Sequence, residues 1–220
     1  MKKALSLILA LVLCLSLCAC GKSTAITKEG MLESAETTDL NTITTVTNDN
    51  LAKATQKYCN KTLKVTGFII DIEADHIRLA CDAIYGRPGM DVYLPSEEIA
   101  ELSQNQLITV VGKTTEAIKE RTHTVAGYDW IEKYYEMPQA YLVDDSFEVK
   151  VTIDDQGKLA LQGPSAYSIN EERLYMPGSF RPSEYETNTI LKIVATIFRK
   201  NGEYDYYVVD YEIINVEALG

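Results

Sequence analysis

The first twenty residues constrain this chain more than any other stretch, because they decide which residues fold and which solvent surrounds them. Lys2 and Lys3 open the chain, and an uncharged, largely apolar run follows over residues 4–17. This run is shorter than the roughly 20 apolar residues that a membrane-spanning helix needs. A positive start, a short apolar run and a small residue, Ala19, are typical of a secretory signal peptide. We therefore expect residues 1–19 to be removed.

The end of this run, Leu17-Cys18-Ala19-Cys20, resembles the lipobox of bacterial lipoproteins. In that family the signal is cut before the cysteine, and the sulfur receives a diacylglycerol with acyl chains such as palmitate. The resemblance implies lipidation of Cys20. Two acyl chains, at about 0.8 kcal/mol per buried methylene, give stable attachment. We expect a lipoprotein anchored to the cell membrane and facing the extracytoplasmic side; the alternative is an ordinary secretory signal that leaves Cys20 as a free thiol.

The charge of the chain disfavours one large class of partners. Acidic residues outnumber basic ones by 32 to 21, and loss of Lys2 and Lys3 takes the net charge from −11 to about −13. A surface of this sign repels phosphate backbones, so a nucleic-acid partner is unlikely on electrostatic grounds.

Two cysteines remain beyond the N-terminal region, Cys59 and Cys81. An extracytoplasmic location permits a disulfide between them. We favour two buried thiols instead, because Cys59 precedes the first predicted strand and Cys81 ends the second, which does not bring them within bridging distance.

Residues 20–47 are predicted to be the lipidated cysteine and a flexible tether. The stretch is rich in Thr, Ser, Glu and Ala and has no aromatic residue. Such a composition offers little apolar surface to offset the entropy of ordering. A tether would hold the folded part away from the lipid headgroups.

From residue 48 the pattern changes to a helix followed by strands. Asn48 or Asn50 can cap a helix that carries Leu51, Ala54 and Tyr58 on one face. Gly67 interrupts the first strand, as at a bulge or sharp bend. Alternating apolar residues predict strands over residues 62–72, 76–81, 89–94, 106–113 and 140–144, with a short helix over 95–102.

This order resembles the OB-fold, and in particular the tRNA_anti-like OB domains. The residues that carry the resemblance are Tyr58, 61–67, 102–106 and 108–113. It covers residues 48–145 and implies a five-stranded barrel with one short helix. The chain departs from the family in residues 114–138, which are longer than the usual link between the last two strands.

That inserted stretch supplies the candidate binding residues Tyr128, Trp130, Tyr134 and Tyr135. Long loops in compact domains are often functional, although aromatic residues also close the end of a barrel. We expect a short helix over residues 129–135.

Residues 146–220 are predicted to form a second, small β-domain. Alternation predicts strands over 147–153, 158–161, 190–198 and 206–214, the last two joined by Asn201-Gly202, a strong hairpin signal. The sequence leaves open whether this part is a second OB-like barrel or a small sheet packed on the first domain.

The sequence contains no recognisable catalytic motif and only two histidines, His76 and His123. Asp71, Glu73 and Asp75 begin like a calcium loop but lack its later glycine and glutamate, so we interpret them as an acidic turn. We expect no metal and no cofactor. The preferred function is a binding or accessory module for a protein, peptide or glycan at the cell envelope; the alternative is an envelope hydrolase that uses carboxylates.

Overall fold

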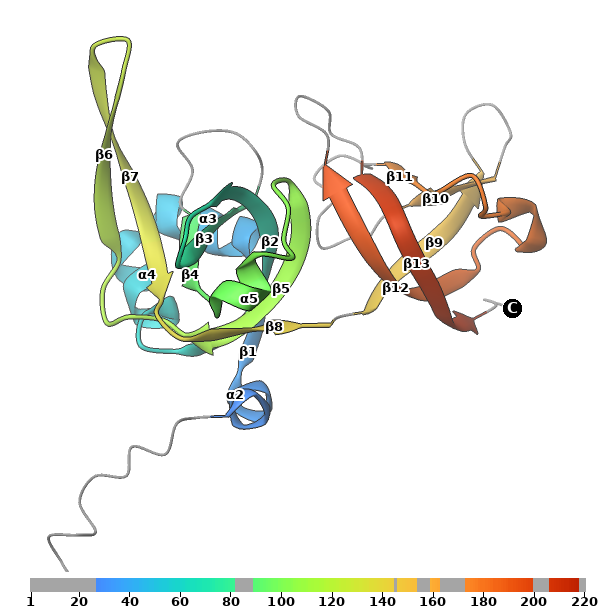
Figure 1. Cartoon of the computed structure of the whole chain (residues 1–220), viewed down its shortest axis with the longest axis horizontal. Helices are drawn as coiled ribbons and strands as arrows, with labels where there is room; N and C mark the ends of the chain where they lie inside the picture. The colour runs from blue at the N-terminus through green and yellow to red at the C-terminus, as the bar shows by residue number, and fades with distance from the viewer. Residues whose placement is uncertain are drawn as a thin grey trace, which may run out of the picture.

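The computed structural model describes residues 27–81, 89–144, 146–153, 159–162, 173–199 and 206–217 (Figure 1). Within these residues the protein is mostly β, as expected, and its strands are joined in one large mixed sheet. Along the sheet the order is β13-β11-β10-β9-β12-β5-β2-β3-β4-β7-β6, with β1 beside β2 and β8 beside β5. Cys20 and the signal peptide lie outside the described residues.

The prediction of a flexible tether is wrong for residues 28–47. This segment forms α2 (Lys28–Ser34), β1 (Glu36–Asp39) and α3 (Leu40–Asp49). Thr27 and Asp39 cap the two helices with their side chains, and β1 pairs in parallel with β2. Three apolar residues of the segment belong to the core, because Met31, Leu40 and Ile43 are each at most 2% exposed.

The strands of the first half follow the sequence prediction closely. They are β2 (Thr62–Ile72), β3 (His76–Ala80), β4 (Gly89–Tyr93), β5 (Gln106–Lys113) and β8 (Ala140–Val143), with helices α4 (Leu51–Tyr58) and α5 (Ser96–Ile99). Asn50 caps α4 as expected. Inward-facing residues of β2, β3, β4 and β5 form one hydrophobic cluster with Tyr58, Leu40 and Ile43. Cys59 and Cys81 form no disulfide with each other; Cys59 is buried and Cys81 is partly exposed.

The predicted helix over residues 129–135 is wrong. The inserted stretch is instead an antiparallel hairpin of β6 (Lys119–Val125) and β7 (Tyr128–Met137). Ala126 and Gly127 turn the chain with φ values of 52° and 83°, the positive pair that a tight hairpin turn requires. In Figure 1 this hairpin extends away from the body of the first half.

The second half is built from β9 (Ser146–Ile153), β10 (Leu159–Gln162), β11 (Arg173–Tyr175), the 3-10 helix η1 (Pro182–Glu184), β12 (Ile190–Arg199) and β13 (Tyr206–Glu217). The expected β12–β13 pairing is present. A second hydrophobic cluster lies here and also includes Phe68 and Leu107 from the first half. Strand β12 pairs with β5, so the two halves share one sheet. The OB-like barrel is not confirmed, because this sheet is not closed.

Candidate functional site

One face of the sheet formed by β3, β4, β7 and β6 gathers charged and aromatic side chains. Alternation produces it: Met90 and Val92 of β4 point into the core, so Asp91 between them points to the other side. We call this side the polar face. Its members are His76, Arg78, Asp91, Tyr93, Lys119, Arg121, His123, Trp130, Glu132, Tyr134 and Glu136.

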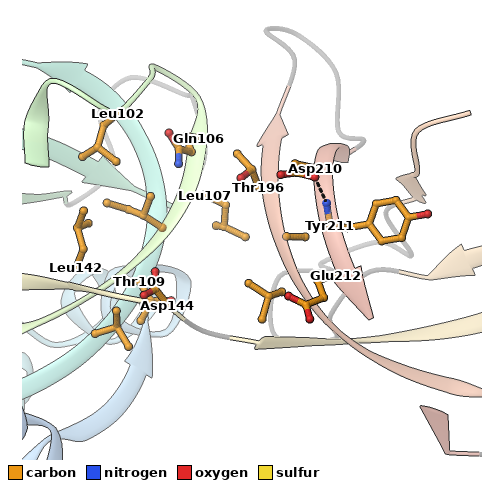
Figure 2. Close-up of a pocket in the computed structure, with 14 residues that line it drawn as sticks. Leu102, Gln106, Leu107, Thr109, Leu142, Asp144, Thr196, Asp210, Tyr211 and Glu212 are labelled. Carbon is orange, nitrogen blue, oxygen red and sulfur yellow. Dashed lines mark hydrogen bonds between the residues drawn. The ribbon is translucent and has the colours of Figure 1, made fainter. Parts of the chain in front are cut away.

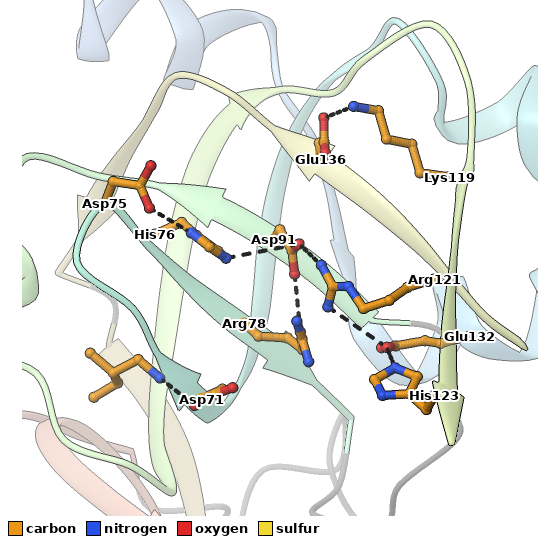
Figure 3. Close-up of polar contacts among 11 residues, drawn as sticks. Asp71, Asp75, His76, Arg78, Asp91, Lys119, Arg121, His123, Glu132 and Glu136 are labelled. Carbon is orange, nitrogen blue, oxygen red and sulfur yellow. Dashed lines mark hydrogen bonds and ion pairs between the residues drawn. The ribbon is translucent and has the colours of Figure 1, made fainter. Parts of the chain in front are cut away.

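Asp91 lies at the centre of the polar face, and its side chain is 2% exposed (Figure 3). Arg78 Nε donates to Asp91 Oδ1 over 3.1 Å, and Arg121 Nη2 donates to Asp91 Oδ2 over 2.5 Å. His76 Nε2 lies 4.0 Å from Asp91 Oδ2. Burial raises the pKa of Asp91, and the hydrogen bond and charge of Arg78 oppose this rise. The carboxylate is therefore held by charged neighbours rather than by water.

Arg121 also connects Asp91 to a second buried carboxylate, Glu132. Arg121 Nη1 lies 3.8 Å from Glu132 Oε2, and His123 Nε2 makes a 2.6 Å hydrogen bond to the same oxygen. The Glu132 side chain is 5% exposed. Two acids, an arginine and a histidine from β4, β6 and β7 thus form one connected network.

Aromatic rings on the polar face contact side chains of the same network. The ring of His123 stacks on Trp130 with centroids 4.2 Å apart, and that of His76 stacks on Tyr93 at 5.0 Å. The Arg121 guanidinium lies 4.4 Å from the centroid of Tyr134. Burial, and then the charge of Glu136, raises the pKa of both Tyr93 and Tyr134. These rings are therefore neutral and held in one orientation.

The four candidate binding residues fall into three different settings. Trp130 and Tyr134 lie on the polar face, and Tyr128 lies beside the hairpin turn with 80% exposure. Tyr135 is 1% exposed and belongs to the core: its hydroxyl is 2.8 Å from Thr47 Oγ1, and its ring packs edge-on against Tyr58. Tyr135 is therefore a core residue rather than a binding-surface residue.

The hairpin itself exposes apolar surface. Besides Tyr128, Ile131 is 60% exposed on the face of β7 opposite to Trp130. Strand β6 ends the sheet order, and among the described residues no strand pairs with its outer edge. The hairpin thus presents an open strand edge together with two exposed apolar side chains.

The two buried carboxylates of the polar face are not placed to act in hydrolysis. A general acid or base must reach a substrate proton, whereas Asp91 and Glu132 are nearly inaccessible and are already bonded to Arg78, Arg121 and His123. The described residues contain no group of His, Cys, Asp or Glu suited to hold a metal. Asp71 and Asp75 lie at the β2–β3 turn, where Asp75 bonds to His76.

The network around Asp91 is the part of this site that sequence reasoning missed. One signal was available, because Arg78 and Asp91 are directly opposite across the consecutive strands β3 and β4. The contact with Arg121, thirty residues further on, depends on the parallel pairing of β4 with β7, which no local pattern indicates.

The fold and the polar face define a mostly β protein with a rigid, mixed-charge sheet surface. No family model, curated protein or solved structure matches this chain. In the part of the chain that the structure describes, no helix is long and apolar enough to cross a bilayer. A function for this protein must therefore rest on its own residues.

Proposed function

We propose that this chain is an extracytoplasmic, lipid-anchored accessory protein that binds a protein partner at the cell envelope through the β6–β7 hairpin. The observation that carries the binding role is the hairpin: it extends from the body, has an open edge on β6, and exposes Tyr128 and Ile131. The anchoring role rests on the N-terminal sequence and Cys20.

The chemistry of the hairpin favours a protein over other partners. Tyr, Trp and Arg are the residue types that dominate binding energy at protein interfaces, and Tyr128, Trp130 and Arg121 lie along one hairpin. An open strand edge can accept a strand from a partner. Side chains that already stack or pair with their neighbours on the polar face lose little conformational entropy on binding, which favours affinity.

We further propose that residues 48–145 form an OB-like domain. In support, β7 pairs in parallel with β4 while β8 pairs with β5, and only Pro138 and Gln139 separate β7 from β8. One segment of chain thus borders both ends of the series β5-β2-β3-β4. OB-folds bind ligands beside their second and third strands, which correspond here to β3 and β4 of the polar face.

The binding role is tested by affinity capture from solubilised native membranes with the tagged full chain. We expect a reproducible partner whose recovery falls about tenfold or more with Tyr128→Ala plus Trp130→Ala, since loss of hot-spot residues costs about 2 kcal/mol or more. Val209→Ala, which truncates another exposed residue on β13, should not change recovery. Equal recovery with both variants, or retention on a glycan column instead of a protein, would count against this function.

The anchoring role is tested separately. With Cys20→Ser, we expect loss of incorporated fatty acid and release of the protein from the membrane fraction. Incorporation that persists in Cys20→Ser would show that the lipid is attached elsewhere, and no incorporation in the wild type would show that the signal is of the ordinary secretory type.

A further inference from the structure

A cleft of about 500 Å³ lies between the two halves of the protein (Figure 2), and none of its described lining residues belongs to the β6–β7 hairpin. Strands β5 and β8 of the first half form one wall, and β12 and β13 of the second half form the other. Cavities of this size at the junction of two structural units are common ligand sites.

The cleft exists because two paired strands separate. β5 and β12 pair only at Leu107–Ile197 and Gln106–Phe198. Beyond these pairs β8 takes the edge of β5, and β9 takes the edge of β12 up to Val194. Among the described strands, none pairs with Ala195 and Thr196 on the side that faces the cleft, so this short stretch of strand edge lies open.

The apolar side chains of the cleft come from both walls. Leu102, Leu107 and Leu142 line it from the first half, and Val194 and Ala195 line it from the second. A ligand that fills the cleft must therefore carry apolar groups that reach both walls.

The charge of the cleft has a single sign. Asp144, Asp210 and Glu212 line it, and among the residues that the structure describes no lysine, arginine or histidine does. All three acids are exposed, and none makes an ion pair within the described residues; Asp210 accepts only the backbone N–H of Tyr211. A group of negative carboxylates around a partly apolar cleft raises the local concentration of cations.

We propose that this cleft binds an extended peptide segment of a partner protein in which basic and aliphatic side chains alternate. Successive side chains of an extended peptide point to opposite sides. The aliphatic side chains of such a peptide can therefore contact the apolar residues of the cleft walls, while its Lys or Arg side chains reach Asp144, Asp210 and Glu212. The open edge at Ala195 and Thr196 supplies backbone hydrogen bonds to such a segment.

Binding is tested on the purified full chain in detergent, with a fluorescent acetyl-(Lys-Leu)₃-amide as the probe. We expect saturable binding that weakens with added salt, and no binding of the matched acetyl-(Glu-Leu)₃-amide. Asp144→Asn, Asp210→Asn and Glu212→Gln together should weaken binding about tenfold, because each exposed pair contributes modestly. The control Asp49→Asn, Glu116→Gln and Glu120→Gln removes the same charge from exposed sites that do not line the cleft and should bind like the wild type.

A second variant tests whether the probe binds in the cleft, without changing the charge of the protein. Thr196→Phe places a ring in the cleft and should also abolish binding, whereas Trp130→Ala on the hairpin should not. The proposal is overturned if both probes bind equally, if neither binds, or if either cleft variant with an unchanged melting temperature binds like the wild type. Loss of partner capture by hairpin variants with intact probe binding would separate this site from the proposed function.

Discussion

At the scale of single residues, Arg121 holds two acidic side chains that water hardly reaches. Its guanidinium contacts Asp91 and Glu132, whose side chains are 2% and 5% exposed. Arg121→Met keeps the apolar stem over Tyr134 but leaves both carboxylates without the shared cation. We expect a loss of about 2 kcal/mol in the free energy of unfolding at neutral pH, since each buried carboxylate loses one charged partner and keeps Arg78 or His123. Urea denaturation measures this loss.

The same variant should also change how stability depends on pH. Burial already raises the pKa of Asp91, and removal of a neighbouring cation raises it further. A carboxyl group with a higher pKa in the folded state destabilises the fold when ionised, and this penalty is lost as pH falls through the folded pKa. Arg121→Met should therefore recover stability relative to the wild type on acidification from about pH 7 to about pH 5.

The control for this experiment is Lys119→Met. Lys119 pairs with Glu136 on the same face, but its side chain is about half exposed, so the substitution should change neither the stability nor its pH profile measurably. A deficit in Arg121→Met that is equal at both pH values would show that packing, not charge, explains the role of Arg121.

Tyr135 gives a second prediction, at alkaline pH. Burial raises its pKa to about 12 from an ordinary value of 10, so the folded state resists ionisation and stability falls as pH rises above 10. Tyr135→Phe should cost about 1 kcal/mol at neutral pH, because the bond to Thr47 is lost, yet it should lose less stability than the wild type between about pH 9 and pH 11. Melting curves measure both effects. Tyr128→Phe, at an exposed position, should behave like the wild type.

At this scale, the sequence predicted which segment carries the aromatic residues of the polar face, but not which of their side chains point to the core. The concentration of aromatic residues in 114–138 pointed to Trp130 and Tyr134, which do lie on the polar face. Because β7 is a strand and not a helix, side chains alternate, and Tyr135 turns to the core while Tyr134 beside it does not. The hairpin was missed because its turn is Ala126-Gly127, not one of the usual Asn-Gly or Asp-Gly pairs.

At the scale of elements, α3 is part of the core, and a contact with β2 tests this. A Cβ added at Gly67 would lie 2.3 Å from Leu40 Cδ1. Gly67→Ala alone should destabilise by about 1–3 kcal/mol through overpacking, and Leu40→Ala alone by about 2–5 kcal/mol through a cavity. The double variant should lose less than the sum of the two, since the new methyl enters the space that Leu40 leaves.

Urea denaturation of the four proteins in this cycle measures the coupling between the two sites. Leu51→Ala, which truncates a 39% exposed residue of α4, should change stability by no more than about 0.5 kcal/mol. Strictly additive losses in the free energy of unfolding would mean that α3 does not pack on β2 through Leu40. That result would favour the original prediction of a tether over residues 28–47.

The elements that the sequence predicted well are long strands rich in β-branched and aromatic residues. β2, β5, β12 and β13 each contain many such residues and span eight residues or more. The prediction of a tether for residues 28–47 was wrong because it rested on average composition, which does not show where in the segment the apolar residues lie. Its apolar residues are few, but α3 places Leu40, Ile43, Thr44 and Thr47 on the buried side, and two of the four are threonines.

At the scale of the whole molecule, a small junction connects the two halves. Besides the two residue pairs between β5 and β12, it contains the stack of Phe68 on Tyr206, with centroids 5.7 Å apart. The Arg199 guanidinium lies within 5.8 Å of both ring centroids, and its backbone N–H donates to Asn105 O over 3.0 Å. Pairing between sequence-distant strands such as β5 and β12 has no local signature, so the sequence alone predicts two domains and leaves open how they meet.

Removal of Phe68 should therefore separate the unfolding of the two halves. Phe68 is 3% exposed and is one of two residues that the first half contributes to the second hydrophobic cluster. Phe68→Ala should cost about 3–5 kcal/mol, and we expect calorimetry to show two transitions where the wild type shows one. The connection near residue 145 should be cleaved faster by protease, since fewer contacts hold the halves together. Val209→Ala, on the exposed side of β13, should leave a single transition. If Phe68→Ala also unfolds in one transition at a lower temperature, the shared sheet, and not the Phe68–Tyr206 stack, couples the unfolding of the two halves.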